Sequence, residues 1–124
     1  MPRTSYEELS GFEDVYLEDS YLLGIDEEAQ SLVLTVELVL RETHELYQPP
    51  KVDEQYCYRR ARIVFDDVRE LRWVKKRLQP VPGPDEPPDF GNIDWLFIED
   101  NHYEIGGEWG AIELDSASPR IEYL

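Results

Sequence analysis

The feature that most constrains the fold of this chain is a two-residue alternation of side-chain character over residues 32–41. The aliphatic positions are Leu32, Leu34, Val36, Leu38 and Leu40. Three of the odd-numbered positions carry polar or charged residues, namely Thr35, Glu37 and Arg41. Because successive side chains of a β-strand point to opposite faces of a sheet, this pattern predicts a strand with one face buried in a core.

Two segments before this strand also carry strand patterns. Tyr21, Leu23 and Ile25 alternate in the same way, and only a short polar stretch, residues 26–31, separates them from the alternating strand. This spacing predicts a β-hairpin. Residues 12–17 are predicted to supply an edge strand ahead of the hairpin.

Proline-containing loops divide the middle of the chain. Residues 42–55 contain two adjacent prolines, which a central strand does not tolerate, and are predicted to be a loop. Strand character returns over residues 56–65. Residues 68–78 fit both a helical stripe and an alternating strand, and we favour the extended conformation. Residues 79–89 are rich in proline and predict an irregular loop.

The last third of the chain contains short β-prone runs at residues 93–99, 103–105, 111–114 and 121–124. Turn-forming residues at roughly ten-residue spacing separate them, which is typical of antiparallel strands. The sequence therefore predicts an all-β fold with at most one short helix, built as an antiparallel sandwich or a small open barrel. Residues 1–124 are expected to form one domain. The predicted core contains Leu23, Ile25, Leu34, Val36, Leu38, Ile63, Phe65, Ile112 and Leu114.

The net charge of the chain limits its partners. The sequence has 28 acidic and 12 basic residues, a formal charge of −16 at pH 7. Charge of this size disfavours nucleic acid and anionic membrane surfaces and favours a basic protein as partner. Such charge is also typical of disordered chains, but three Trp, eight Tyr and four Phe residues indicate a folded core.

The basic residues are concentrated in residues 59–77, between two acidic regions. We expect this arrangement to give cross-strand ion pairs on a solvent-exposed sheet face. The alternative is a dipolar surface whose anionic face is free to meet a partner. Binding of nucleic acid by the basic run is opposed by the overall charge. The run consists of Arg59, Arg60, Arg62, Arg69, Arg72, Lys75, Lys76 and Arg77.

No residue cluster in the sequence predicts catalysis, a cofactor or a metal site. His44 begins a motif like that of zinc metalloproteases, but Gln48 stands where a second His is required. With His102 as the other histidine and Cys57 as the single thiol, a zinc site would need carboxylates from distant strands. A single Cys also allows no intrachain disulfide and fits a reducing cytosol. We expect no enzymatic activity, no cofactor and no metal.

The sequence predicts a soluble, cytoplasmic protein. Its first residues lack the apolar segment of a signal peptide. The longest apolar-rich run, residues 32–40, contains Glu37 and is too short to cross a bilayer.

Five short segments carry a family resemblance. Residues 89–94 read DFGNID and residues 107–114 read GEWGAIEL, while upstream residues 17–21 read LEDSY, residues 44–50 HELYQPP and residues 57–59 CYR. Together they resemble small bacterial immunity or immunity-like proteins, which protect a cell from a secreted polymorphic toxin. The resemblance covers most of the chain and implies an all-β, non-enzymatic inhibitor whose surface matches one toxin. It supplies no binding residues to carry over.

The surface character is compatible with that resemblance. Toxic nucleases are basic because they hold phosphates, and an acidic protein rich in Tyr and Trp can cover such a site. We therefore predict a binding protein that neutralises a basic bacterial toxin by direct contact. Two alternatives remain: a phage-encoded nucleic-acid mimic that blocks a host defence protein, and a small enzyme or ligand-binding domain with an unrecognised site. The oligomeric state is left open.

Two segments combine acidic and aromatic residues and are predicted to contact the partner. In residues 94–104 these are Trp95, Glu99, Asp100, Tyr103 and Glu104. In the loop before the strand over 56–65 they are Tyr47, Asp53, Glu54 and Tyr56. The charges are expected to speed association and the rings to supply affinity. Trp95 fits either this contact surface or the hydrophobic core, and for this residue we favour the core.

Overall fold

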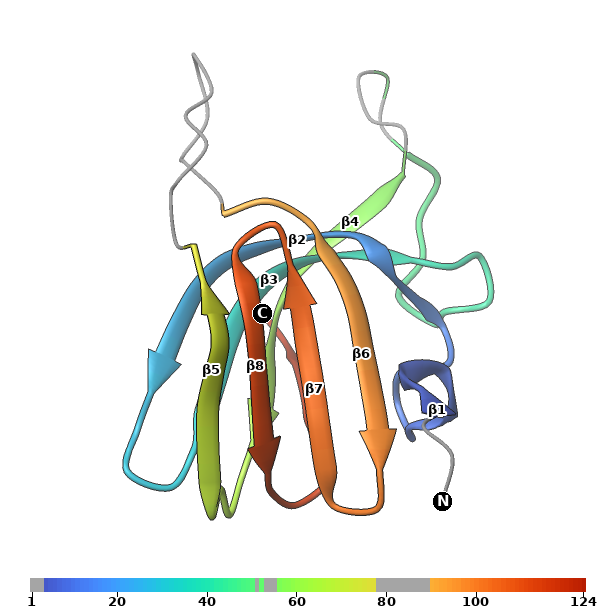
Figure 1. Cartoon of the computed structure of the whole chain (residues 1–124). Coiled ribbons are helices and arrows are strands. Elements are labelled where there is room, and N and C mark those ends of the chain that lie inside the picture. Colours follow the sequence, from blue (N-terminus) through green and yellow to red (C-terminus); the bar gives the residue numbers. More distant parts are fainter. Residues whose placement is uncertain (1–3, 51, 53–55, 78–89) are drawn as a thin grey trace.

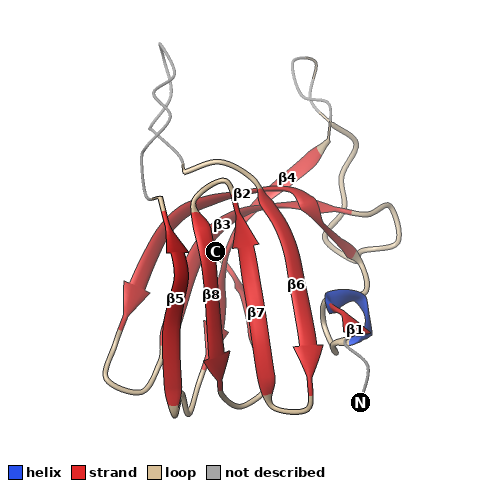
Figure 2. Ribbon diagram, in the orientation of Figure 1, coloured by secondary structure: helices blue, strands red, loops and turns tan. Residues whose placement is uncertain are grey.

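A computed structural model of the chain describes residues 4–50, 52, 56–77 and 90–124. Its strands form two antiparallel sheets, one in front of the other in Figures 1 and 2, with a hydrophobic core between them. The prediction of an all-β fold is confirmed, and the architecture is a sandwich of two open sheets. The predicted proline-rich loop at residues 79–89 lies outside the described residues. The elements are β1 (Thr4–Ser5), the 3-10 turn η1 (Tyr6–Glu8), β2 (Val15–Glu27), β3 (Leu32–Leu40), β4 (Cys57–Phe65), β5 (Glu70–Lys76), β6 (Ile93–Glu99), β7 (His102–Gly107), β8 (Gly110–Asp115) and β9 (Arg120–Tyr123).

The four-stranded sheet has the strand order β2-β3-β4-β9. Its centre is the alternating segment of the sequence, because every aliphatic position of that pattern is buried in β3. The predicted hairpin is confirmed as β2 and β3, which pair antiparallel. The edge strand predicted over residues 12–17 begins only at Val15, because residues 12–14 form a turn. Its strand part and the segment predicted as a separate strand from Tyr21 belong to one long strand, β2. An irregularity in its pairing explains the interrupted pattern.

The five-stranded sheet has the strand order β1-β6-β7-β8-β5. Strands β6, β7 and β8 form the predicted C-terminal meander, but the last predicted run, β9, pairs with β4 in the other sheet. The extended conformation favoured for residues 68–78 is confirmed over Glu70–Lys76. Asp100 adopts a positive φ of 55° in the turn between β6 and β7, a conformation that Asp tolerates better than most residues.

Seven of the nine residues predicted for the core are buried, and two are corrected. Leu23 and Ile25 are only partly buried. Leu22, the neighbour of Leu23 in β2, is fully buried in the core instead. The register of β2 shifts between Leu22 and Gly24, and this shift moves the alternation by one position. The largest fully buried side chain, Trp109, lies in the turn that joins β7 and β8.

Candidate interaction site

The outer face of the four-stranded sheet carries four tyrosines, Tyr16, Tyr21, Tyr56 and Tyr58, which we term the tyrosine cluster. Tyr16 in β2 and Tyr58 in β4 both lie opposite Val39 of β3, so these three side chains share the outer face. The ring of Tyr58 lies 6.2 Å from that of Tyr21 and 6.2 Å from that of Tyr56. These distances are typical of packed aromatic pairs. The rings of Tyr21, Tyr58 and Tyr56 therefore form one connected surface.

The irregularity in β2 places two of these tyrosines on the same face. Tyr16 and Tyr21 are five residues apart and would point to opposite faces of a regular strand. Their partners in β3 are Val39 and Glu37, which are only two residues apart, so β2 contains three extra residues at this point. Buried Ser20 holds the distortion, because its Oγ accepts the Val39 N–H at 2.9 Å and donates to the Tyr16 carbonyl at 2.8 Å.

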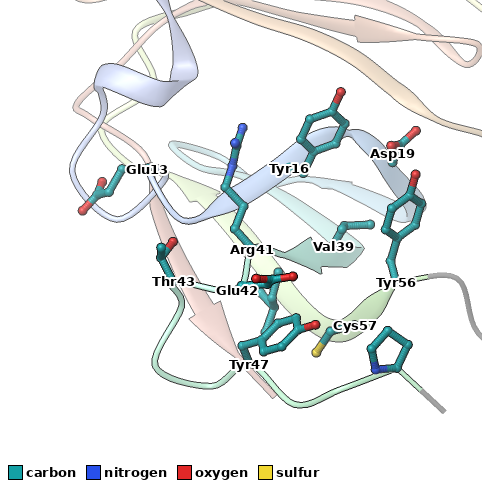
Figure 3. Close-up of a pocket in the computed structure, with 12 residues that line it drawn as sticks. Glu13, Tyr16, Asp19, Val39, Arg41, Glu42, Thr43, Tyr47, Tyr56 and Cys57 are labelled. Carbon is teal, nitrogen blue, oxygen red and sulfur yellow. The ribbon is translucent and has the colours of Figure 1, made fainter.

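A groove of about 920 Å³ opens beside the tyrosine cluster. Its apolar lining consists of Val39 and Leu40 at the end of β3, Pro50 in the loop that follows, and Cys57 at the start of β4. Figure 3 shows Tyr16 and Tyr56 standing on either side of Val39. The groove thus joins an apolar lining to two aromatic side walls.

Most of the remaining lining of the groove is polar and its charge is mainly negative. The ionisable carboxylates are those of Glu13, Asp19 and Glu42, against the single guanidinium of Arg41. That guanidinium lies 5.1 Å from the centre of the Tyr16 ring, where a cation is attracted by the π-electrons. The Arg41 Nε also donates to the carbonyl oxygen of Val15 at 3.1 Å. The one cation of the lining is therefore engaged within the fold.

The loop after β3 forms the outer rim of the groove and is tied to the far edge of the same sheet. The backbone N–H of Leu46 donates to Nδ1 of His44 at 3.0 Å. With Nδ1 acting as acceptor, the neutral imidazole carries its proton on Nε2, which lies 2.7 Å from the hydroxyl of Tyr123 in β9. Tyr47, which follows this turn, lines the groove.

Negative groups surround the hydroxyls of the tyrosine cluster. The carboxylate of Asp19 raises the pKa of Tyr56 above its usual range and also accepts a hydrogen bond from it. Burial, together with the nearby Tyr21 and Glu37, raises the pKa of Tyr58 to about 12. The phenols of Tyr56 and Tyr58 therefore stay neutral over the physiological range. The site presents hydrogen-bond donors, aromatic faces and carboxylates to a partner.

The structure brings two of the predicted loop residues to this groove. Tyr47 and Tyr56 both line it, whereas Asp53 and Glu54 lie outside the described residues. Sequence reasoning missed Tyr16 and Asp19 at the same site. The available signal was the break in alternation after Tyr16, which marks a distorted strand.

The second predicted segment lies on the outer face of the other, five-stranded sheet. Trp95 is neither in the core nor free of contacts, because its ring covers Gly106, where a Cβ would lie 2.2 Å from a ring carbon. Glu99 and Glu104 also face outward from β6 and β7. Asp100 is exposed in the connecting turn.

Tyr103 requires a correction as a contact residue. Its side chain is 3 % exposed, and its ring packs against Phe65 with the centres 5.7 Å apart. Alternation along β7 sends Tyr103 into the core while its neighbours His102 and Glu104 face outward. Charge and aromatic content along a segment do not distinguish the two faces of its strand.

The described residues of the two predicted segments are not brought together. Tyr47 and Tyr56 line the groove on the four-stranded sheet, whereas the outward-facing residues of the second segment lie on the other sheet. Across the residues that the structure describes, no cluster of three His, Cys, Asp or Glu side chains is arranged to hold a metal ion. No helix in this described part is long and apolar enough to span a membrane. Comparisons with protein-family models, with curated proteins and with solved structures found no match to this chain.

Proposed function

We propose that this protein is a non-enzymatic acidic binding protein, and that it acts as an immunity protein that neutralises a basic bacterial toxin by direct contact. The observation that carries the proposal is the groove on the four-stranded sheet, where three carboxylates and three tyrosines line the space around an apolar floor. Protein interfaces are centred on partly buried aromatic anchors surrounded by polar groups. The groove has this composition.

The net charge supports a basic partner. At a formal charge of −16, the protein attracts a positively charged surface at long range and repels nucleic acid. Steering of this kind raises the association rate, and the rings supply short-range affinity once the surfaces touch. The immunity role itself is supported by the resemblance of the sequence segments to immunity proteins.

The experiment that tests the proposal combines capture with rescue. Tagged wild-type protein and a groove variant, Tyr16→Ala with Tyr56→Ala, are used to capture partners from the native organism. We expect a basic protein that is retained by the wild type and lost by the variant. Expression of that protein alone should arrest growth, and co-expression of the wild type should restore it.

Two results would contradict the proposal. One is a captured partner that is acidic or harmless when expressed alone. The other is a partner bound equally well by the wild type and the groove variant. Capture of a restriction or other defence protein, with no toxicity of its own, would favour the nucleic-acid mimic instead.

A further inference from the structure

The groove beside the tyrosine cluster has the shape and chemistry to receive one planar cation. Figure 3 shows the rings of Tyr16 and Tyr56 on two sides of Val39, with Asp19 next to the Tyr56 hydroxyl. Val39 lines the groove between the two rings and is itself only 3 % exposed. The space between the rings therefore has an apolar floor. A side chain that enters here meets aromatic faces along its length and a carboxylate at one side.

The protein's own Arg41 illustrates how a guanidinium binds at this site. Its guanidinium carbon lies 5.1 Å from the centre of the Tyr16 ring. Its Nε is bonded to the Val15 carbonyl, and a terminal nitrogen lies 3.4 Å from the carboxylate of Glu7. Stacking on a ring and bonding to oxygens at the edge is the usual mode of Arg recognition. The Tyr56 side of the groove offers the same two elements, a ring and the carboxylate of Asp19.

The local potential favours a second cation there. Asp19, Tyr16 and Tyr21 all raise the pKa of Tyr56, which means that negative and phenolic oxygens surround its hydroxyl. Three carboxylates line the groove against one guanidinium. A carboxylate that accepts one bond from Tyr56 retains lone pairs for further donors. An incoming cation would therefore find an acceptor in place.

From this geometry we propose that the groove binds an arginine side chain of the basic protein partner, with the guanidinium stacked on Tyr56 and paired with the carboxylate of Asp19. This inference rests on the proposed function. Arginine fits better than lysine because the guanidinium is planar, is weakly hydrated and carries several donors in a fixed fork. The partner is thus a protein that presents an exposed arginine on its basic surface.

The test uses small probes on the full chain, followed by nuclear magnetic resonance of the tyrosine rings. N-acetyl-arginine amide should shift the ring signals of Tyr16 and Tyr56 with a dissociation constant in the millimolar range. N-acetyl-lysine amide should bind more weakly. N-acetyl-citrulline amide, which has nearly the same shape but no charge, should give no saturable shift.

Matched variants assign the effect to the site. Asp19→Asn should weaken binding of the arginine probe about three-fold, while Glu99→Gln, which removes the same charge from the opposite sheet, should leave it unchanged. Tyr56→Leu should weaken it about five-fold, and Tyr56→Phe, which keeps the ring, should restore most of the binding. Unchanged amide spectra of each variant show that the fold is retained.

The outcomes separate this inference from the proposed function. Equal binding of the arginine and citrulline probes, or equal effects of Asp19→Asn and Glu99→Gln, would overturn the arginine site. Loss of the captured toxin from the groove variant, together with no binding of the arginine probe, would leave the proposed function standing without this inference. Specific binding of the arginine probe, together with no captured toxin, would support the arginine site and contradict the proposed immunity function.

Discussion

The outer faces of the two sheets use aromatic and charged side chains in different ways. On the five-stranded sheet, Trp95 lies flat over Gly106, and Arg72 of β5 pairs with Glu113 of β8 across the strands. Arg72 and Glu113 lie directly opposite each other in an antiparallel pair, where side chains meet, and Trp95 directly follows a one-residue irregularity in β6. On the four-stranded sheet, Tyr16 and Tyr56 of the tyrosine cluster instead line an open groove, at the point where β2 departs from regular pairing.

This difference shows why net charge and composition did not locate the site. Both faces carry acidic and aromatic residues, but the irregularities differ in size. The five-stranded sheet has one extra residue in β6 and one in β5, whereas β2 of the four-stranded sheet has three extra residues between Tyr16 and Tyr21. A distorted strand brings side chains from outside the two-residue repeat onto one face and leaves space between them. We therefore expect the groove face to carry affinity and the opposite face to contribute mainly long-range charge.

The largest expected effect is on affinity for the partner. Tyr16→Ala combined with Tyr56→Ala should weaken binding about 30-fold or more, since buried aromatic anchors dominate interface energies. Phe97→Ala on the five-stranded sheet, measured by the same calorimetric titration, should change affinity less than about three-fold. A larger loss from Phe97→Ala than from the double variant would reverse the assignment of the two faces.

The next effect is on stability and tests the irregular strand. Ser20→Ala removes the acceptor of the Val39 N–H and leaves that buried donor unpaired, at a cost of about 2 kcal/mol in the free energy of unfolding. Ser116→Ala removes one bond, from the Ser116 hydroxyl to the Ala117 carbonyl, in the turn after β8 and should cost less. Urea denaturation measures both, and equal losses would mean that Ser20 does not hold the distortion.

Removing three charges from each face separates steering from contact. Glu99→Gln, Asp100→Asn and Glu104→Gln together should slow association about three-fold at low salt, with a flatter dependence on salt and little change in dissociation. The triple variant of Glu13, Asp19 and Glu42 should slow association to a similar degree and also speed dissociation. Stopped-flow mixing measures both rates. Faster dissociation from the first triple variant would place those residues inside the interface.

Alkaline pH provides a smaller effect, through which one residue of the tyrosine cluster can be tested. Tyr58 has its pKa raised from 10.0 to about 12 in the folded protein, so it stays protonated where the unfolded chain ionises. Its contribution to stability is complete below pH 10 and is lost as the pH rises through 12. Tyr58→Phe should therefore reduce the fall in unfolding free energy between these values, as measured by urea denaturation at several pH values. Trp95 and Phe97 on the opposite face do not ionise. If Phe97→Leu reduced the fall in unfolding free energy as much as Tyr58→Phe does, the fall would not come from the ionisation of Tyr58.

The smallest expected effect is that of a metal chelator, which should be none. A metal ion bound to the native state alone would raise the melting temperature. We expect the same Tm with and without chelator, measured by differential scanning calorimetry. A drop of many degrees would mean that carboxylates on one of the two faces hold an ion.

Much of the fold can be predicted from the alternating patterns of the strands. The remainder depends on which strands pair and in which register, and a local sequence pattern does not specify this. The two-residue repeat identified β3, the hairpin with β2 and the meander of β6 to β8. It placed Leu23 in the core in place of Leu22, because a register shift in β2 depends on the partner strand. It also could not indicate that β9 crosses to the other sheet, since an isolated short strand has no preference between two open edges.

The candidate site was predictable only in part, for a related reason. Tyr47 and Tyr56 were expected from acidic and aromatic content in one loop, and both line the groove. Their neighbours there, Tyr16 and Asp19, come from a strand more than twenty-five residues earlier in the chain, and only the folded sheet brings them close. Tyr103 is buried although its segment is acidic and aromatic, because alternate residues of β7 face the core and the solvent.

The strand order has a consequence for how the molecule assembles. The sheet of C-terminal strands includes β1, and the sheet of N-terminal strands includes β9, so each sheet contains one strand from the other end of the chain. The four-stranded sheet, which bears the groove, therefore lacks its last strand until residue 123 has left the ribosome. Pairings of such long sequence separation form late and slowly. During synthesis, the β4 edge to which β9 pairs would stay open, and a nascent chain would be most exposed to aggregation in that interval.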